Sequence, residues 1–307
     1  MRVKIRSHES KYAFYLEIIL EVLYIFTKRI VSYFFGMEIV DQTGCCIKLA
    51  SKPVRVISLV PSQSEFLWDI GIQHGRLIGI TKFCIHPNEL YRSVARVGGT
   101  KNCDIKKIKE LSPDLIIGNK EENNREQIIE LKKHYPVWLS DVNNLQDALL
   151  MMEILGQLAG MKKNADQIIE KVKALHTSFI KHKSDFLKSI RVAYLIWKNP
   201  LMVVGRNTFI DAMIAECGFI NVFSDLERYP VVTIDDINNL RPDFVFLSSE
   251  PFHFSERDEM EIQNSLFQSQ VLKVNGECFS WYGSRLLSSF TYFELLINKI
   301  KSLSQKR

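Results

Sequence analysis

Side chains able to hold a ligand follow several apolar runs that are typical of buried parallel strands. In the first half of the chain these side chains are Ser62, Gln63, Lys82, Phe83, Lys101, Asn102, Lys120 and Glu121. In the second half they are Trp197, Glu250, Trp281, Tyr282 and Arg285. Because open α/β sheets place their ligands at the carboxyl ends of the strands, we expect these residues to line one cleft.

The residue types in these loops predict non-covalent binding. Each of the three lysines alone is typical of a solvated surface, but together, at successive strand ends, they indicate a cleft of positive character. Aromatic side chains in loops, where no core requires them, favour contact with a flat or apolar partner. Ser62 and Glu65 also fit an S-x-x-E capping box ahead of a helix that starts at Phe66, so a purely structural role for this turn stays open.

No catalytic or nucleic-acid motif accompanies these residues. The chain has no G-x-S-x-G, H-E-x-x-H, P-loop or G-x-G-x-x-G motif. The adjacent Glu121 and Glu122 are more typical of charges at a helix start than of an acid–base pair. The formal charge of +5 is small for 307 residues, and the basic residues are scattered. We therefore expect a monomeric binding protein that has no covalent cofactor, binds no nucleic acid and is not an enzyme.

Histidines and cysteines do not predict a metal site. Of the seven histidines, only His86 and His253 fall in strand-end loops, whereas a bare metal ion needs several converging ligands. The six cysteines include no C-x-x-C pair. Cys84 and Cys103 both follow predicted strands, so they either face one cleft or are unrelated thiols, the commoner case.

The same α/β unit occurs twice in the sequence. The order of residue types over 105–117 recurs 129 positions later, over 234–246. Each copy reads as a short helix, a Pro-Asp turn and a buried strand. A looser correspondence joins 52–59 to 189–196, where a basic residue precedes the strand that opens each half. These repeats predict an α/β fold with two like lobes and parallel sheets.

A long helical pattern without glycine or proline lies between the two copies, over 164–189. Its apolar side chains recur at helical spacing and are Ala165, Ile168, Val172, Leu175, Phe179 and Phe186. A helix of this length spans roughly 39 Å at 1.5 Å per residue, which is enough to join two bodies. We predict a first lobe over 37–163, a connecting helix over 164–189 and a second lobe over 190–307.

The first 36 residues carry a long apolar run after a basic start. Glu17 and Glu21 interrupt the run, and a carboxylate at the bilayer centre costs about 2.5–3.5 kcal/mol. No small-x-small cleavage site follows, and Gln42 stands where a lipoprotein signal has an aliphatic residue before Cys45. Three interpretations stay open: a divergent signal or anchor, an extension of little function ahead of a start at Met37, and an amphipathic surface helix.

Several motifs in both halves resemble those of the class III solute-binding proteins of ABC importers, the family of the cobalamin and ferric-siderophore receptors. The motifs are RVISLVPSQSEFLWDIG, GITKFCIHP, RVGGTKN and LSPDLIIGNKEEN, then LIWKNP, YPVVTIDDINNLRPDFVFLSSEP and SWYGSR. Their order and spacing agree over about 38–296. The resemblance implies two Rossmann-like lobes joined by one rigid helix, with the ligand held between them and little hinge motion.

The resemblance also implies a ligand, a partner and a location. The ligand would be a metal chelate, namely cobalamin or another corrinoid, a ferric siderophore or haem, and the partner an ABC permease dimer that docks onto an acid of each lobe. Asp235 keeps that acid in the second lobe, whereas Lys106 reverses the charge in the first. Two functions stay open: capture for import, in the periplasm or on a membrane facing it, and a cytoplasmic or membrane-tethered carrier or sensor that does not dock.

Overall fold

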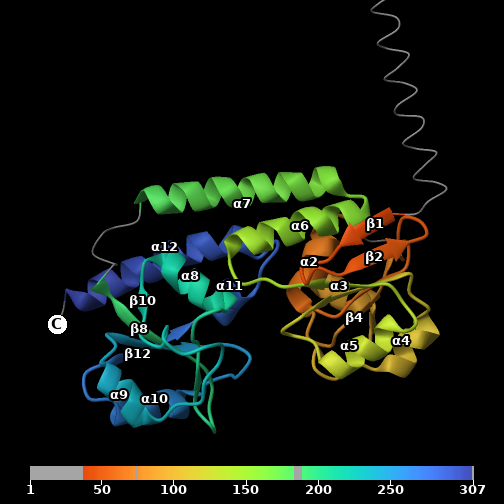
Figure 1. Ribbon diagram of the computed structural model, residues 1–307. Coiled ribbons are helices and arrows are strands. Elements are labelled where there is room, and N and C mark those ends of the chain that lie inside the picture. Colours follow the sequence, from red (N-terminus) through yellow and green to blue (C-terminus); the bar gives the residue numbers. More distant parts are fainter. Residues whose placement is uncertain (1–36, 73–74, 183–188, 306–307) are drawn as a thin grey trace, which may run out of the picture.

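The computed structural model describes residues 37–72, 75–182 and 189–305. Figure 1 shows two α/β lobes side by side beneath one long helix. The predictions made for residues 1–36 and 183–188 lie outside the described residues. Within the described ranges, no helix combines the length and the hydropathy that crossing a membrane requires. The predicted fold class, two α/β lobes with parallel sheets, is confirmed.

The first lobe contains a sheet of five parallel strands in the order β5-β4-β3-β6-β7. The strands are β3 (Val56–Ser58), β4 (Leu77–Ile80), β5 (Ala95–Arg96), β6 (Leu115–Asn119) and β7 (Val137–Ser140). The helices are α2 (Pro61–Asp69), α3 (Asn88–Ser93), α4 (Ile105–Leu111), α5 (Arg125–Lys132) and α6 (Leu145–Ala159). In this doubly wound order the chain leaves β3 and β6 in opposite directions, which opens a crevice at their carboxyl ends.

A hairpin precedes this sheet. Strands β1 (Met37–Val40) and β2 (Cys46–Leu49) pair antiparallel, outside the main sheet. The Asp41 carboxylate makes the turn, because its Oδ1 accepts hydrogen bonds from the backbone N–H groups of Thr43 at 2.9 Å and Cys45 at 2.8 Å. Cys45 therefore belongs to a folded hairpin, and cleavage before it would remove β1.

The second lobe repeats the plan with one antiparallel strand added. Its parallel strands have the order β10-β8-β11-β12, and β9 pairs antiparallel with β8. The strands are β8 (Arg191–Trp197), β9 (Met202–Val203), β10 (Ile220–Asn221), β11 (Phe244–Ser248) and β12 (Gln270–Val274). The helices are α8 (Phe209–Cys217), α9 (Ile234–Leu240), α10 (Glu256–Ser265), α11 (Gly276–Ser280) and α12 (Leu286–Ser304).

The predicted repeat is confirmed down to its hydrogen bonds. Helices α4 and α9 start and end at equivalent positions, as do strands β6 and β11. The Asp114 carboxylate accepts a hydrogen bond from the backbone N–H of Arg55 at 2.9 Å, and Asp243 accepts the equivalent bond from Arg191 at 2.8 Å. In both lobes the arginine guanidinium also donates to the last carbonyl of the helix that precedes the aspartate, which is α4 in the first lobe and α9 in the second. Arg55, just before β3, and Arg191, the first residue of β8, thus join each opening strand to the neighbouring helix and turn.

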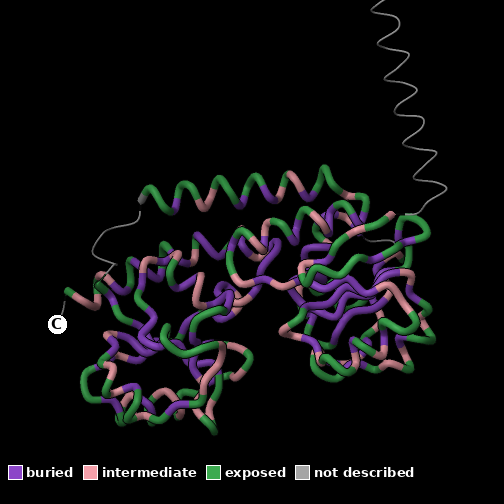
Figure 2. The backbone as a smooth tube through the Cα atoms, in the orientation of Figure 1, coloured by how far each residue is buried: buried purple, intermediate pink, exposed green. Residues whose placement is uncertain are grey.

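The long helix α7 (Lys162–His182) begins two residues before the predicted start. Its buried stripe consists of Ala165, Ile169, Val172 and Phe179, so Ile169 takes the place that the spacing had given to Ile168. This stripe packs on α6 of the first lobe and on α12 of the second. Figure 2 shows the opposite face of α7 exposed along most of its length. The helix is therefore a bridge that rests on both lobes.

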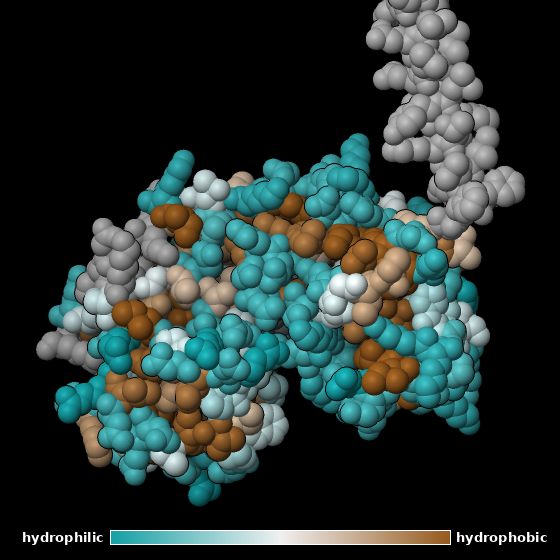
Figure 3. Space-filling view, viewed as in Figure 1, coloured by the Kyte–Doolittle hydropathy of each residue, from teal (hydrophilic) through white to brown (hydrophobic). Residues whose placement is uncertain are grey.

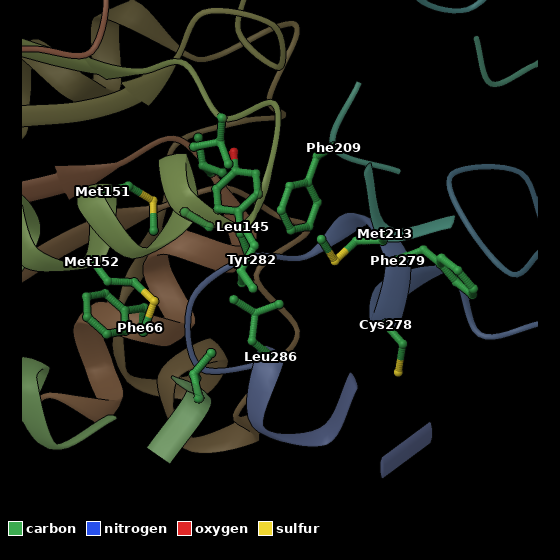
Figure 4. Close-up of a cluster of buried hydrophobic side chains, with 14 of the residues drawn as sticks. Phe66, Leu145, Met151, Met152, Phe209, Met213, Cys278, Phe279, Tyr282 and Leu286 are labelled. Atoms are coloured by element: carbon green, nitrogen blue, oxygen red, sulfur yellow. The ribbon is translucent and has the colours of Figure 1, made fainter. Parts of the chain in front are cut away.

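One apolar core continues from the first lobe into the second beneath α7. Figure 4 shows Phe66 and Met152 of the first lobe approaching Phe209 and Leu286 of the second, with Tyr282 between them. All five side chains are buried. Each lobe also has an apolar cluster of its own, on the side of its sheet that faces away from the shared core. The connecting helix is thus not the only contact that fixes the lobes, because helices α2, α6, α8 and α12 share this core.

The two thiols that follow strands of the first lobe do not face one cleft. The Cys84 thiol contacts the hydroxyls of Thr81 at 3.2 Å and Ser64 at 3.3 Å within the core that both lobes share. Cys103 lies in the separate cluster on the other side of the first sheet. They are unrelated buried thiols, as the commoner alternative predicted.

Replacing Phe66 by alanine should lower the free energy of unfolding by about 3–5 kcal/mol, because a buried ring is lost from the shared core. The phenyl ring is fully buried, at 0% exposure. Urea unfolding followed by tryptophan fluorescence measures the change. The matched control is Phe267→Ala, since Phe267 is 81% exposed and its loss should change stability by less than about 0.5 kcal/mol. Similar losses in both variants would contradict a shared core around Phe66.

Candidate ligand-binding site between the lobes

The carboxyl edges of the two sheets face each other. Glu121 and Glu122, which follow β6, contact Arg228 and Tyr282 of the second lobe. His86, in the loop after β4, contacts Glu277, which follows β12. Figure 3 shows a notch between the lobes on the side away from α7. The strand ends of both lobes therefore meet at one place, as the strand-end pattern predicted.

The base of this junction is tightly packed. Gly283 has a φ of +95°, and a Cβ added there would lie 3.0 Å from Cβ of Phe66 and 3.3 Å from the carbonyl oxygen of Ser62. Only glycine tolerates this φ and this approach without strain. The segment from Trp281 to Arg285 is thereby pressed onto α2, and we call this contact between the segment and α2 the seam.

An ion pair between Arg285 and Glu65 joins the two lobes at one end of the seam. The guanidinium of Arg285 donates from Nη2 to Oε1 of Glu65 at 2.6 Å and from Nε to Oε2 at 3.2 Å. The exposed fraction is 19% for the Arg285 side chain and 12% for Glu65. Burial raises the pKa of Glu65, and the charge of Arg285 opposes that rise. Such a two-point, little-exposed pair is among the stronger hydrogen-bonded contacts of proteins.

A tyrosine and a glutamate join the lobes at the other end. The Tyr282 hydroxyl donates to Oε1 of Glu122 at 2.8 Å. Burial raises the pKa of Glu122 to about 7, while the hydrogen bond from Tyr282 opposes the rise and the charge of Glu250 adds to it. Next to this pair, Nη2 of Arg228 lies 2.9 Å from Oε1 of Glu121. Burial also raises the pKa of Glu121, against the charge of Arg228.

The predicted capping box is wrong. Helix α2 starts at Pro61 and not at Phe66, its N-cap is Val60, and no side chain caps it. Proline at the first helical position replaces the cap, because it has no N–H that needs a partner. Ser62 and Glu65 therefore lie inside the helix, and Glu65 is free to reach Arg285.

The predicted positive character of the strand ends is wrong as well. Nζ of Lys120 lies 2.6 Å from Oδ2 of Asp141, and Lys101 donates to the backbone carbonyl of Glu121. Lys82 lies over the Phe83 ring, with Nζ 5.1 Å from its centroid. The segments after β6, β11 and β12 also each contribute one or more glutamates to the strand ends. The junction is mixed in charge.

The remaining predicted residues differ in how much they are exposed. Gln63 is fully buried and donates to the Ser140 hydroxyl. Trp281 is 7% exposed and lies in the seam, whereas Trp197 is 39% exposed and its ring centroid lies 5.3 Å from that of Phe252. Glu250 accepts a hydrogen bond from the Ser280 hydroxyl, and burial raises its pKa. Exposed Asn102 contacts Gln127 at 3.5 Å.

Two residues of the junction were missed from the sequence, and a third was considered only as a metal ligand. Glu277 follows β12 closely, so a strict application of the strand-end rule would have found it. Arg228 follows a two-residue strand that has no apolar run to mark it. His86 contacts both Glu277 at 3.1 Å and the ring of Trp281 at 5.7 Å. Among the described residues, no cluster of histidine, cysteine and acidic side chains has the geometry of a metal site.

Two α/β lobes that present their strand ends to each other across a shared core define a two-lobed ligand-binding protein. A family model described as periplasmic binding protein matches residues 56–275. The chain therefore belongs to this family of binding proteins, and the resemblance drawn from the sequence motifs is confirmed.

Individual relatives are distant and cover most of the chain. An uncharacterized ABC transporter substrate-binding lipoprotein of Bacillus subtilis is 22% identical over 262 residues, which is 82% of each chain. The vitamin B12-binding protein of Pectobacterium atrosepticum is 24% identical over 79% of this chain and 88% of its own. Among solved structures, the periplasmic vitamin B12-binding protein of Vibrio cholerae superposes with a TM-score of 0.66 at 22% identity, over 80% of this chain and 98% of its own.

A periplasmic haem-binding protein of Pseudomonas aeruginosa is similar to the same extent. It superposes with a TM-score of 0.68 at 18% identity, over 80% of this chain and 92% of its own. At these identities the solved structures show the fold that the chain shares. They do not assign its site residues, so the ligand-contacting roles of Lys82, Phe83, Trp197 and the other strand-end residues stay predictions.

Replacing Glu122 by glutamine should stabilise the protein at pH 8 and have little effect at pH 4.5. The folded-state pKa of Glu122 is raised from 4.5 to about 7, so its ionisation opposes folding progressively between these values and fully above them. The gain at pH 8 should be about 1–3 kcal/mol. Urea unfolding at both pH values measures it.

The control for this test is Glu126→Gln, which removes an exposed carboxylate near the start of α5. Glutamine at 122 keeps the acceptor for the Tyr282 hydroxyl, so any change reports the charge and not the hydrogen bond. A gain for Glu122→Gln that is equal at both pH values, or equal to that of the control, would refute a raised pKa at this position.

Proposed function

We propose that this protein captures a metal chelate between its two lobes and delivers it to an ABC importer. The observation that carries the proposal is the meeting of the two carboxyl edges, since ligands of open α/β lobes bind outside the ends of their strands. The family supports it, and so do relatives whose names include binding of vitamin B12 or haem. A ferric hydroxamate transport protein of Saccharomonospora viridis, with a TM-score of 0.62 and 16% identity, has the same fold.

The ligand in this proposal is a corrinoid, a ferric siderophore or haem. Exposed aromatic rings at strand ends, Phe83 at 49% after β4 and Trp197 at 39% at the end of β8, suit the flat or apolar faces of such chelates. Few cations remain for the acidic groups of a chelate, because Arg285 and Arg228 each pair with a glutamate. Among the lysines predicted to line the cleft, only Lys82 has an aromatic ring as its contact.

A second candidate is a binding protein that does not dock to a transporter. Lys106 and Asp235 favour it, because they are equivalent in the repeat, follow the first residue of α4 and α9, and are both exposed. The outer faces of the two lobes thus carry opposite charges where the family resemblance implies two acids. The family and the lipoprotein relative support a location outside the cytoplasm. The cytoplasmic form of this candidate has no such support.

The ligand can be identified by titrating the purified full-length protein with vitamin B12, haemin and a ferric hydroxamate. Isothermal calorimetry and the absorbance of each chromophore measure binding. We expect one of them to bind with a Kd below about 1 μM, which corresponds to about −8 kcal/mol. Failure of all three to bind would refute the proposed function.

Docking can be tested with Asp235→Lys in the cells that produce the protein. If the protein serves an importer, uptake of the radiolabelled chelate identified above should fall at least about tenfold while its Kd stays unchanged, because a rim charge that steers association has been reversed. The matched control is Glu256→Lys, which reverses an exposed acid at the start of α10. Unchanged uptake with Asp235→Lys would favour the binder that does not dock.

A further inference from the structure

Arg285 was expected from the sequence to line the ligand cleft, but its guanidinium contacts side chains of the protein itself. Nε and Nη2 bind the Glu65 carboxylate at 3.2 and 2.6 Å. Nη1 lies 3.6 Å from Oε2 of Glu277. The ring of Trp281 covers one face, with its centroid 5.3 Å from Cζ. A guanidinium offers five N–H groups in one plane. Glu65 binds two of those of Arg285, Glu277 adds a second carboxylate near Nη1, and Trp281 covers one face.

The backbone of Arg285 is held as firmly as its side chain. Its carbonyl accepts hydrogen bonds from the backbone N–H groups of Ser288 at 2.9 Å and Ser289 at 3.1 Å, at the start of α12. The Ser288 hydroxyl donates to the same carbonyl at 2.9 Å. The side chain therefore extends from the fixed end of a helix of the second lobe.

Glu65 is fixed on the opposite side. It lies within α2, which follows the central strand β3 of the first lobe directly, and its neighbour Phe66 is fully buried in the shared core. The Arg285–Glu65 pair therefore connects two rigid elements, one from each lobe. Its two hydrogen bonds fix both the distance and the relative rotation of those elements, which a single contact would not do.

We propose that Arg285 is a positioning residue of the binding site, which sets the spacing of the two lobes through Glu65 and does not contact the ligand. This inference rests on the proposed function, because the spacing matters only if a ligand lies between the lobes. Trp281 and Tyr282 lie in the same segment as Arg285, so the pair also holds these side chains in place. The width of the site is set before a ligand arrives.

Loss of the pair would leave the lobes joined by the core but free to vary in spacing at the strand ends. If the productive spacing is then populated about a tenth of the time, Kd rises about tenfold. We therefore expect Arg285→Ala and Glu65→Ala each to raise Kd for vitamin B12, or for the chelate that binds in the titration above, about tenfold. The Kd of the double variant should also rise only about tenfold, because both substitutions remove the same interaction.

A distance measurement that needs no ligand accompanies the affinities. Spin labels at Ile129→Cys in α5 and Met260→Cys in α10 report the spacing of the lobes, in a protein whose exposed Cys45 and Cys46 are replaced by serine. Double electron–electron resonance should give a narrow distribution with Arg285 and Glu65 present and a broader one in each alanine variant. Arg285→Lys keeps the positive charge but cannot make two hydrogen bonds to one carboxylate, so the width of its distance distribution should be intermediate.

The control for the distances is Lys198→Ala. It breaks an ion pair that is as little exposed as the seam pair, at 13% for Lys198 and 18% for Asp258, but that lies within the second lobe. Its distance distribution should match that of the parent protein. Circular dichroism and urea unfolding verify that every variant is folded.

The outcomes separate the alternatives. If Arg285 contacts the ligand, Arg285→Ala weakens binding, Glu65→Ala does not, and neither broadens the distances, which overturns the inference. A hundredfold loss in the double variant, or unchanged distances in both single variants, also overturns it. If no chelate binds to the parent protein while both alanine variants broaden the distances, the role in spacing stands and the proposed function fails.

Discussion

The apolar core beneath the two lobes is the constraint on which the rest of the structure depends. Rings of α2 and α11 and the aliphatic side chains of α6, α8 and α12 pack into one cluster. Burying a single such side chain favours folding by about 1.5–3 kcal/mol, so separating the lobes would expose many of them together. The polar contacts of the junction form beside this cluster, which brings their side chains within reach of each other.

The same packing determines the electrostatics of the junction. Glutamates at the strand ends and in α2 lose water when the lobes meet, and burial raises the pKa of Glu65, Glu121, Glu122 and Glu250. An ionised carboxylate in such a place requires a partner. Arg285 and Arg228 provide one for Glu65 and Glu121, and hydroxyls provide one for the other two. Arg285 and Arg228 therefore pair with glutamates of the protein itself.

The duplicated unit explains why the lobes meet in this way. In both copies the aspartate of the Pro-Asp turn accepts a hydrogen bond from the backbone N–H at the start of the opening strand, so the two sheets have the same local register. The two sheets are built on the same plan, and α7 with the shared core lies on one side of both lobes. The carboxyl ends of the strands therefore face each other on the opposite side. The copies have diverged at their outer faces, where Lys106 and Asp235 occupy equivalent positions with opposite charge.

The sequence alone determined the elements and their duplication, because these depend on neighbouring residues. Helices α4 and α9 and strands β6 and β11 form where the repeat over 105–117 and 234–246 predicted a helix and a strand. The strand-end rule located the junction but not the contacts within it. Pro61 shows the limit of local reasoning, since a proline at the first helical position displaced a capping box that the neighbouring residues fitted.

Only the tertiary structure decided which charges meet. Tyr282 and Glu122 are 160 residues apart in the sequence, and Arg285 and Glu65 are 220 apart. No local pattern encodes such a pair, because it arises from the packing of helices that are distant along the chain. The sequence therefore indicated that the strand ends of the two lobes would meet, and the shared core decided that Arg285 faces Glu65 at that junction.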